Sequence, residues 1–214
     1  MTQISESYLD QLRETVMHAM SPKRFRHTVA VEEMAARLCD LFCPEQTQKM
    51  RAAALLHDLT KELDLEQQIK LCEKYHLSVS DADRIAPKTF HARTAAEKIR
   101  LEMPALADPT VVDAVRWHTT GHAGMTLTEK LLYLADYIDE SRSYPNCVIL
   151  RRYFFGAEPQ RMTMDERLAL LRDTLILSFD MTIGDLVAEG MPIAEDTVMA
   201  RNELMLARAK AEQR

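Results

Sequence analysis

The chain has 214 residues, of which 47% are hydrophobic and 28% charged, and its formal net charge is −6. This mixture is typical of a globular protein, and the length allows one large domain or two small ones. The acidic balance argues against a protein that holds nucleic acid on a basic surface. No stretch approaches 18 apolar residues, so we expect no membrane span.

The cysteines and the first residues indicate a compartment. The four cysteines form no C-x-x-C pair and no disulfide spacing. Cys39 and Cys43 lie one helical turn apart in an apolar stripe, which favours core packing over a metal or redox role. The N-terminus has neither the basic segment nor the long apolar run of a signal peptide. We therefore expect a cytoplasmic protein.

The helix signals follow one another closely in the first half of the chain. Only five glycines occur, and Ala, Leu, Met, Glu, Lys and Arg dominate, which favours helices. Ser21-Pro22 ends one helix and opens the next, and Asp64 caps another. Residues 78–88 are predicted to be looser chain. The helices predicted here are about 6–20, 22–42, one that starts after Cys43-Pro44 and carries residues 50–63, and then 65–75 and 89–103.

The second half continues the pattern. Asp108-Pro109 opens a helix that Gly121 ends, and Thr126 with Glu129 has the spacing of a capping box. The later helices are predicted at about 126–142, 146–154, 165–189 and from 195 onward. No alternation typical of strands persists for five residues, and no repeat or flexible linker is found. The sequence therefore predicts an all-α fold, with residues 1–214 in a single domain.

Two polar residues stand directly after an apolar run. Residues 52–56 are small or aliphatic, and His57 and Asp58 follow them. A carboxylate buried in such surroundings is costly without a cation. Aspartate oxygen and neutral histidine nitrogen are good ligands for iron, manganese or zinc. Neighbours on a helix point about 100° apart, so further ligands must come from other helices.

The same anomaly recurs twice. Asp136 interrupts the apolar run LLYLADY, and His27 is followed by an apolar stripe. Either residue alone is more often a surface group or a satisfied core polar group. Three anomalies in the order H…HD…D indicate one metal site shared by the residues His27, His57, Asp58 and Asp136.

This order resembles the signature of the HD superfamily of metal-dependent phosphohydrolases. Longer motifs, spread over residues 24–203, narrow the resemblance to the YqeK family of bacterial HD-domain hydrolases, which cleave diadenosine tetraphosphate symmetrically into two ADP. The resemblance implies a helical HD-domain bundle with a metal-binding core at about 22–142 and helices at about 146–213 that close over the nucleotide. The motifs are RFRHTVAV, AALLHDLTKEL, FHARTAA, RWHTTGHAGMTLTEKLLYLADYIDESRSYP and DTVMARNEL.

The resemblance also implies roles for single residues. It implies iron ligation by His27, His57, Asp58 and Asp136, with manganese, cobalt or zinc as alternatives. Because these residues fill four coordination positions, we expect a single metal, and His91 and His118 leave a second one open. It implies catalytic roles for Asp58, His91 and His118. The implied nucleotide contacts are His91, His118, Asp136, Arg142, Ile193, Thr197, Arg201 and Asn202. The family usually has a proline where Glu140 stands and often an arginine where His122 stands.

Three further residues have open interpretations. Lys61 could reach a phosphate or be a solvated helix end. His118 lies at a predicted helix C-terminus, where an imidazolium is favoured and would suit a proton donor to the leaving phosphate. Trp117 could stack on adenine or belong to the core.

The predicted activity is hydrolysis of a phosphoanhydride by a metal-activated water. The nearest alternatives are a deoxynucleotidase, a guanosine tetraphosphate hydrolase or a cyclic-nucleotide phosphodiesterase, although the long HD-GYP motif is absent. A non-catalytic nucleotide-binding regulator and a purely structural helical bundle are further alternatives. The expected partner is a nucleotide substrate, without direct nucleic acid or membrane binding, and a homodimer stays open.

Overall fold

A computed structural model describes residues 4–213, apart from the side chain of Ala82. Within these residues the chain forms eleven α-helices, three short 3-10 helices and no strand, which confirms the all-α prediction. The α-helices are α1 (Glu6–Ala19), α2 (Pro22–Phe42), α3 (Thr47–Leu56), α4 (Leu65–Lys74), α5 (Asp81–Ile85), α6 (Phe90–Glu102), α7 (Pro109–Trp117), α8 (Leu127–Ile138), α9 (Pro145–Gly156), α10 (Met164–Ala188) and α11 (Glu195–Glu212). The 3-10 helices are η1 (Pro44–Gln46), η2 (Pro87–Thr89) and η3 (Pro159–Arg161).

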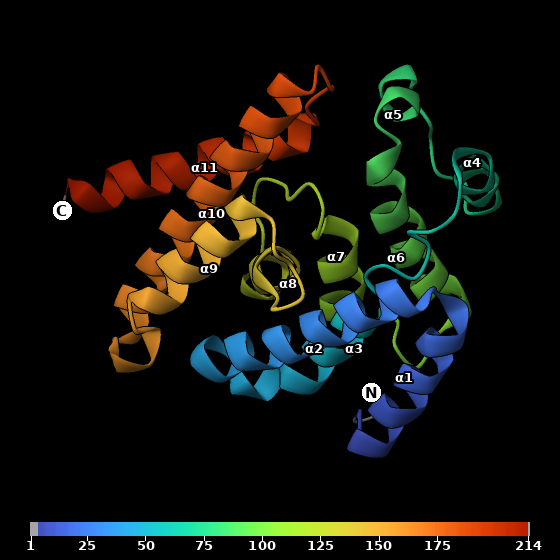
Figure 1. Ribbon diagram of the computed structural model, residues 1–214, viewed down its shortest axis with the longest axis horizontal. Helices are drawn as coiled ribbons and strands as arrows, with labels where there is room; N and C mark the ends of the chain where they lie inside the picture. Colours follow the sequence, from blue (N-terminus) through green and yellow to red (C-terminus); the bar gives the residue numbers. More distant parts are fainter. Residues whose placement is uncertain (1–3, 214) are drawn as a thin grey trace.

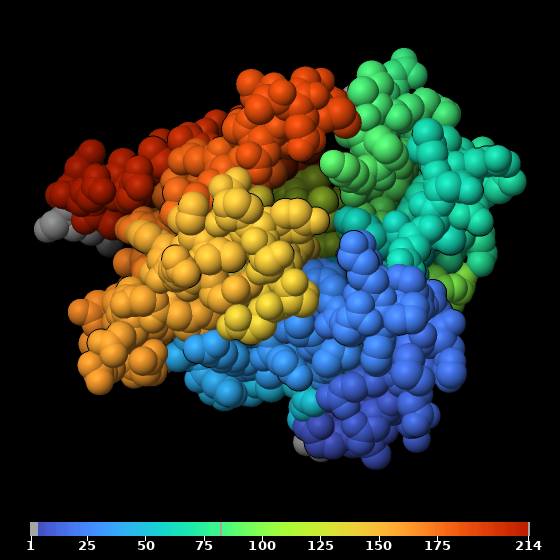
Figure 2. Space-filling view, viewed as in Figure 1, coloured from blue at the N-terminus to red at the C-terminus, as the bar shows by residue number. Residues whose placement is uncertain are grey.

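Helices α7 and α8 lie at the centre of the molecule (Figure 1). Helices α1 to α3 pack on one side of them, α4 to α6 form one flank, and α9 to α11 form the other. The surface is hollowed between the orange end of α10 and the green segment around α5 (Figure 2). The core includes Cys39 and Cys43, both buried as free thiols, which confirms their interpretation as core residues. None of the helices formed by residues 4–213 is long and apolar enough to span a membrane.

The predicted helix starts follow from their caps. The Ser21 side chain accepts a hydrogen bond from the backbone of Arg24, and Asp64 and Thr126 each form a complete capping box. These side chains satisfy backbone N–H groups that have no partner within the helix. The start of each of these helices is therefore determined locally.

Three predicted helix ends are wrong. Helix α7, predicted to end at Gly121, ends at Trp117. Helix α3 ends at Leu56 rather than Leu63, and the backbone from 57 to 63 forms turns with bonds to the third preceding carbonyl, as from Lys61 to Asp58. Helix α8 ends at Ile138 rather than 142, because Asp139 is extended (φ −58°, ψ 154°). Residues predicted as looser chain contain the short helices α5 and η2. The polar residues that directly follow the ends of α3 and α8 are buried, namely His57, Asp58 and Asp139.

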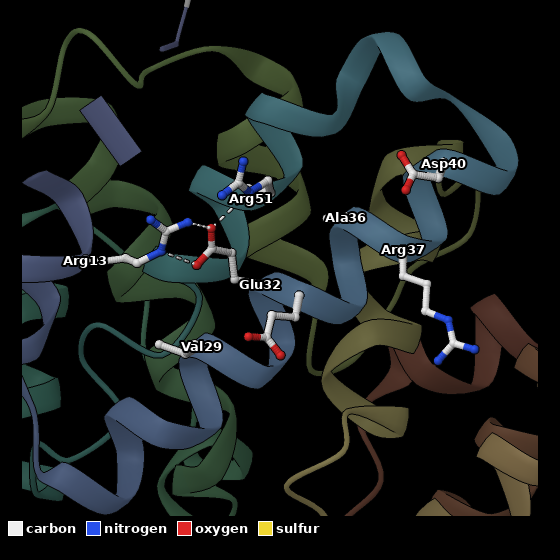
Figure 3. A pocket seen from close by; sticks show the side chains of 8 residues that line it. Arg13, Val29, Glu32, Ala36, Arg37, Asp40 and Arg51 are labelled. Carbon is white, nitrogen blue, oxygen red and sulfur yellow. Dashed lines mark hydrogen bonds and ion pairs between the residues drawn. The ribbon is translucent and has the colours of Figure 1, made fainter. Parts of the chain in front are cut away.

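A buried carboxylate on α2 forms ion pairs with the two neighbouring helices α1 and α3. Glu32 of α2 is 2% exposed and accepts bonds from two arginines, Arg13 of α1 (2.5 and 2.7 Å) and Arg51 of α3 (3.0 Å). Figure 3 shows these three side chains in a surface pocket that Arg37 and Asp40 also line. None of the predicted ligands or nucleotide contacts lines this pocket. The cluster therefore has a structural role.

Replacing Glu32 by alanine should lower the free energy of unfolding by about 3 kcal/mol, because it leaves two partly buried guanidinium groups without their shared partner. The measurement is urea unfolding of the variant beside Glu33→Ala, which removes an exposed carboxylate from the same helix. Equal stabilities of the two variants would contradict this role for Glu32.

Candidate metal centre

Four imidazoles and two carboxylates converge between the central helices. His27 comes from α2, His57 and Asp58 from the turn after α3, His91 from α6, His118 from the end of α7, and Asp136 from α8. His57 keeps helical backbone angles (φ −56°, ψ −38°), and its Nε2 lies 3.3 Å from Oδ2 of its neighbour Asp58.

The four residues predicted as metal ligands lie against one another. His27 Nε2 is 2.9 Å from Asp136 Oδ1 and 3.7 Å from Asp58 Oδ2. His57 Nε2 is 3.3 Å from Asp58 Oδ2 and 3.6 Å from Asp136 Oδ1. One ligand atom from each of His27, His57 and Asp136 lies within 4.8 Å of the other two. The same holds for one ligand atom from each of His57, Asp58 and His118.

Two buried nitrogens in this cluster have no hydrogen-bond partner. The Nε2 atoms of His27 and His57 are enclosed and lie near carboxylate oxygens, but not in hydrogen-bonding geometry. An unpaired buried polar atom is costly. A divalent cation between these nitrogens and the carboxylates would satisfy all of them, so the residues fit a metal.

The opposite ring nitrogens fix the tautomers. Nδ1 of His57 lies 2.6 Å from the Ala54 carbonyl, Nδ1 of His91 lies 2.8 Å from that of Lys88, and Nδ1 of His118 lies 2.7 Å from that of Val115. A carbonyl only accepts, so each Nδ1 carries the proton and donates it. Each Nε2, once it carries no proton, presents its lone pair to the centre, as a metal ligand requires.

Asp139 is a site residue that sequence reasoning missed. Its carboxylate is fully buried, and Oδ2 lies 3.4 Å from Nδ1 of His27 and accepts a bond from Nε of Arg142 at 3.2 Å. The Ser141 backbone donates to Oδ1 at 2.9 Å. Its only sequence signal is an acid three residues after Asp136, which by itself suggests a helix surface.

Two arginines form ion pairs with the carboxylates of Asp136 and Asp58. Arg142, predicted to contact phosphate, donates from Nη2 to Oδ1 of Asp136. Arg24, which sequence reasoning missed, donates from Nη1 to Oδ2 of Asp58 at 2.6 Å. Arg24 is three residues before His27 on α2, and this helical spacing is the signal that was available.

His91 and His118 form the other side of the cluster. Their Nε2 atoms are 3.0 Å apart, and the Thr119 hydroxyl lies 3.2 and 3.1 Å from them. Burial lowers the pKa of both imidazoles, that of His118 well below its usual value. The lowered pKa favours a neutral His118 over the imidazolium suggested by its place at a helix end, because burial and the neighbouring His57 and His91 oppose the charged form. Lys61 Nζ is 3.1 Å from His91 Nε2, so the lysine faces the site.

The predicted C-terminal contacts are bonded elsewhere in the chain. Thr197 is buried and donates to the Thr120 carbonyl at 2.9 Å, and Arg201 binds Asp180 at 2.6 Å. Asn202 is exposed and accepts a bond from Arg201, and Ile193 is half-buried. The structure does not bring these four side chains against the histidine–aspartate cluster, and their contact with a nucleotide stays a prediction.

Metal binding should strengthen as the pH rises. Burial alone would lower the pKa of His57, but Asp58 and Asp136 raise it to about 10 in the metal-free protein. The bound proton therefore stabilises the metal-free fold fully below the ordinary histidine pKa of about 6.5, and this contribution is lost as the pH passes about 10. A metal must displace that proton. Calorimetric titration in buffers of different ionisation enthalpy should detect proton release at neutral pH, and its absence would contradict this account.

The chain is similar in sequence to known proteins. The HD domain family matches residues 24–141 of the chain. A symmetrical bis(5'-nucleosyl)-tetraphosphatase of Halalkalibacterium halodurans is 32% identical over 187 residues, which cover 87% of this chain and 91% of the relative. The protein of that name from Bacillus subtilis is 31% identical over 192 residues, which cover 89% of this chain and 94% of the relative.

The fold is also similar to that of a solved structure. A crystal structure of a protein from Clostridium acetobutylicum, described as a predicted HD superfamily hydrolase involved in NAD metabolism, matches with a TM-score of 0.78 and 29% identity. The match covers 92% of this chain and 97% of that protein.

Proposed function

Because the chain belongs to the HD-domain family, and its curated relatives are symmetrical bis(5'-nucleosyl)-tetraphosphatases, we propose that it hydrolyses diadenosine tetraphosphate to two ADP. The chain is a metal-dependent phosphohydrolase. The convergence of the His27, His57, Asp58 and Asp136 side chains on one point is the observation that supports this most strongly.

The proposed metal is a single iron ion held by His27, His57, Asp58 and Asp136. When bound, it would polarise a phosphoryl oxygen and lower the pKa of a water molecule. The water oxygen attacks one of the two central phosphorus atoms, and the bond from that phosphorus to the oxygen bridging the two central phosphates breaks. Each product is then an ADP.

The protein's own side chains handle the protons. Oδ2 of Asp58 faces His27 and His57, whereas Oδ1 faces Nε2 of His91 at 3.2 Å. Oδ1 can therefore take the proton of the attacking water, and the Nε2 lone pair of His91 can receive it and pass it to the leaving phosphate. The bond from Nδ1 of His91 to the Lys88 carbonyl at 2.8 Å holds the ring in place, and the Thr119 hydroxyl lies 3.2 Å from its Nε2.

Cations around the cluster would bind the phosphates. Arg142 and Arg24 lie on the two carboxylates, and Lys61 lies beside His91. Phosphoryl transfer depends on positioning and on neutralising the equatorial oxygens, so these groups suit a polyphosphate. In this proposal the helices after 146 belong to the same domain and close over the nucleotide through Ile193, Thr197, Arg201 and Asn202.

The state of the cysteines supports a cytoplasmic location for the protein. All four are buried free thiols, which agrees with a reducing compartment such as the cytoplasm.

The deciding experiment combines elemental analysis of the protein purified without added metal with product analysis on a nucleotide panel. The panel contains diadenosine tetraphosphate, deoxynucleotides, guanosine tetraphosphate and a cyclic dinucleotide. We expect ADP as the sole product of the first compound and iron near one equivalent. ATP with AMP, or faster turnover of another member of the panel, would overturn the proposed substrate. Bound nucleotide without turnover would instead favour a binding protein.

A further inference from the structure

The loop of residues 118–126 joins two parts of the site. It begins at His118 and leads into α8, which carries Asp136 (Figure 1). Thr119, the second residue of the loop, places its hydroxyl within 3.2 Å of Nε2 of both His91 and His118. A shift of this loop would therefore disturb the face of the cluster opposite His27.

Helices α10 and α11 hold this loop from outside. Phe179 of α10 packs against Gly121, Thr197 of α11 bonds to the Thr120 carbonyl, and Glu203 of α11 accepts a bond from the Gly124 backbone. Three successive parts of the loop are thus fixed by segments 55 or more residues away in sequence.

The approach at Gly121 is too close for a side chain. Its φ is +62°, and a Cβ atom there would lie 2.7 Å from Cζ of Phe179. Glycine is needed for both reasons. The loop backbone is therefore seated directly on the ring of Phe179.

The Thr197 hydroxyl provides the next constraint. Thr197 is 4% exposed, and its Oγ1 donates to the Thr120 carbonyl at 2.9 Å. Valine would fill nearly the same space without this bond, so shape alone does not require the hydroxyl. Without it a carbonyl in a nearly buried segment would lose its partner, which is costly.

We propose that Thr197 is a positioning residue that holds His118 and Thr119 in place through the Thr120 carbonyl. The proposal rests on the proposed function for its catalytic consequence. It gives the C-terminal helices a second task besides contact with a nucleotide, namely to fix the loop that completes the site.

The test compares metal-loaded Thr197→Val with Thr197→Ser, which keeps the hydroxyl, and with Val198→Ala, an exposed neighbour on the same helix. Thr197→Val should lose about tenfold in kcat on diadenosine tetraphosphate, with KM and metal content within twofold of the parent protein. Hydrogen exchange of residues 118–126 should become several-fold faster. Thr197→Ser should restore both values, and Val198→Ala should leave both unchanged.

Three outcomes would overturn the proposal. These are unchanged exchange in the loop, faster exchange with unchanged kcat, and a raised KM with unchanged kcat, which would make Thr197 a nucleotide contact. Absence of diadenosine tetraphosphate turnover in the parent protein would instead overturn the proposed function, and the exchange measurement would still decide whether Thr197 holds the loop.

Discussion

Asp58→Ala should remove the bound metal and reduce hydrolysis of diadenosine tetraphosphate by about 1000-fold or more. Asp58 lies within 3.8 Å of the Nε2 atoms of His27, His57, His91 and His118, so its loss affects every imidazole of the cluster. A metal that activates water and polarises phosphate supplies several kcal/mol, which corresponds to this rate change. The measurements are metal content by elemental analysis and turnover of the purified protein.

The control for this variant is Asp40→Ala, which removes an exposed carboxylate on the helix that carries His27. It should keep full metal content and full activity. Asp58→Asn preserves the side-chain volume, so it separates loss of charge from misfolding and should also lose the metal. Full activity of a metal-free Asp58→Ala protein would refute the proposed mechanism.

Asp139→Asn should weaken metal binding by about 10- to 100-fold, the usual effect of removing a group that orients a histidine ligand. The Asp139 carboxylate is buried between His27 and Arg142, so one charge orients a metal ligand and a predicted phosphate contact together. An amide keeps the shape but loses the charge, and its NH₂ group would oppose the donors of Arg142. Metal affinity by calorimetry and KM for the nucleotide should both worsen.

Glu140→Gln is the matched control, since it removes an exposed carboxylate from the adjacent position. It should leave metal affinity within twofold of the parent. An Asp139→Asn protein with parental metal affinity would show that His27 is held by the fold alone.

Much of the site could be inferred locally. Asp58 and Asp136 stand inside apolar runs, and the cost of burying a carboxylate without a cation can be read from neighbouring residues alone. Ser21, Asp64 and Thr126 determine the starts of their helices because a cap acts within one turn. Local sequence is therefore enough to predict the all-α class, most helix starts and the candidate ligands.

Other features of the site depend on residues that are distant in sequence. Only the fold shows that Asp139 meets Nδ1 of His27, a residue more than 100 positions earlier, because nothing local distinguishes it from a surface acid. The neutral state of His118 likewise follows from burial by other helices, which overrides its helix-end position. Thr197 and Thr120 meet across 77 residues. Local sequence shows which polar groups would be costly to bury, whereas the packing of distant helices determines which residues bond to them.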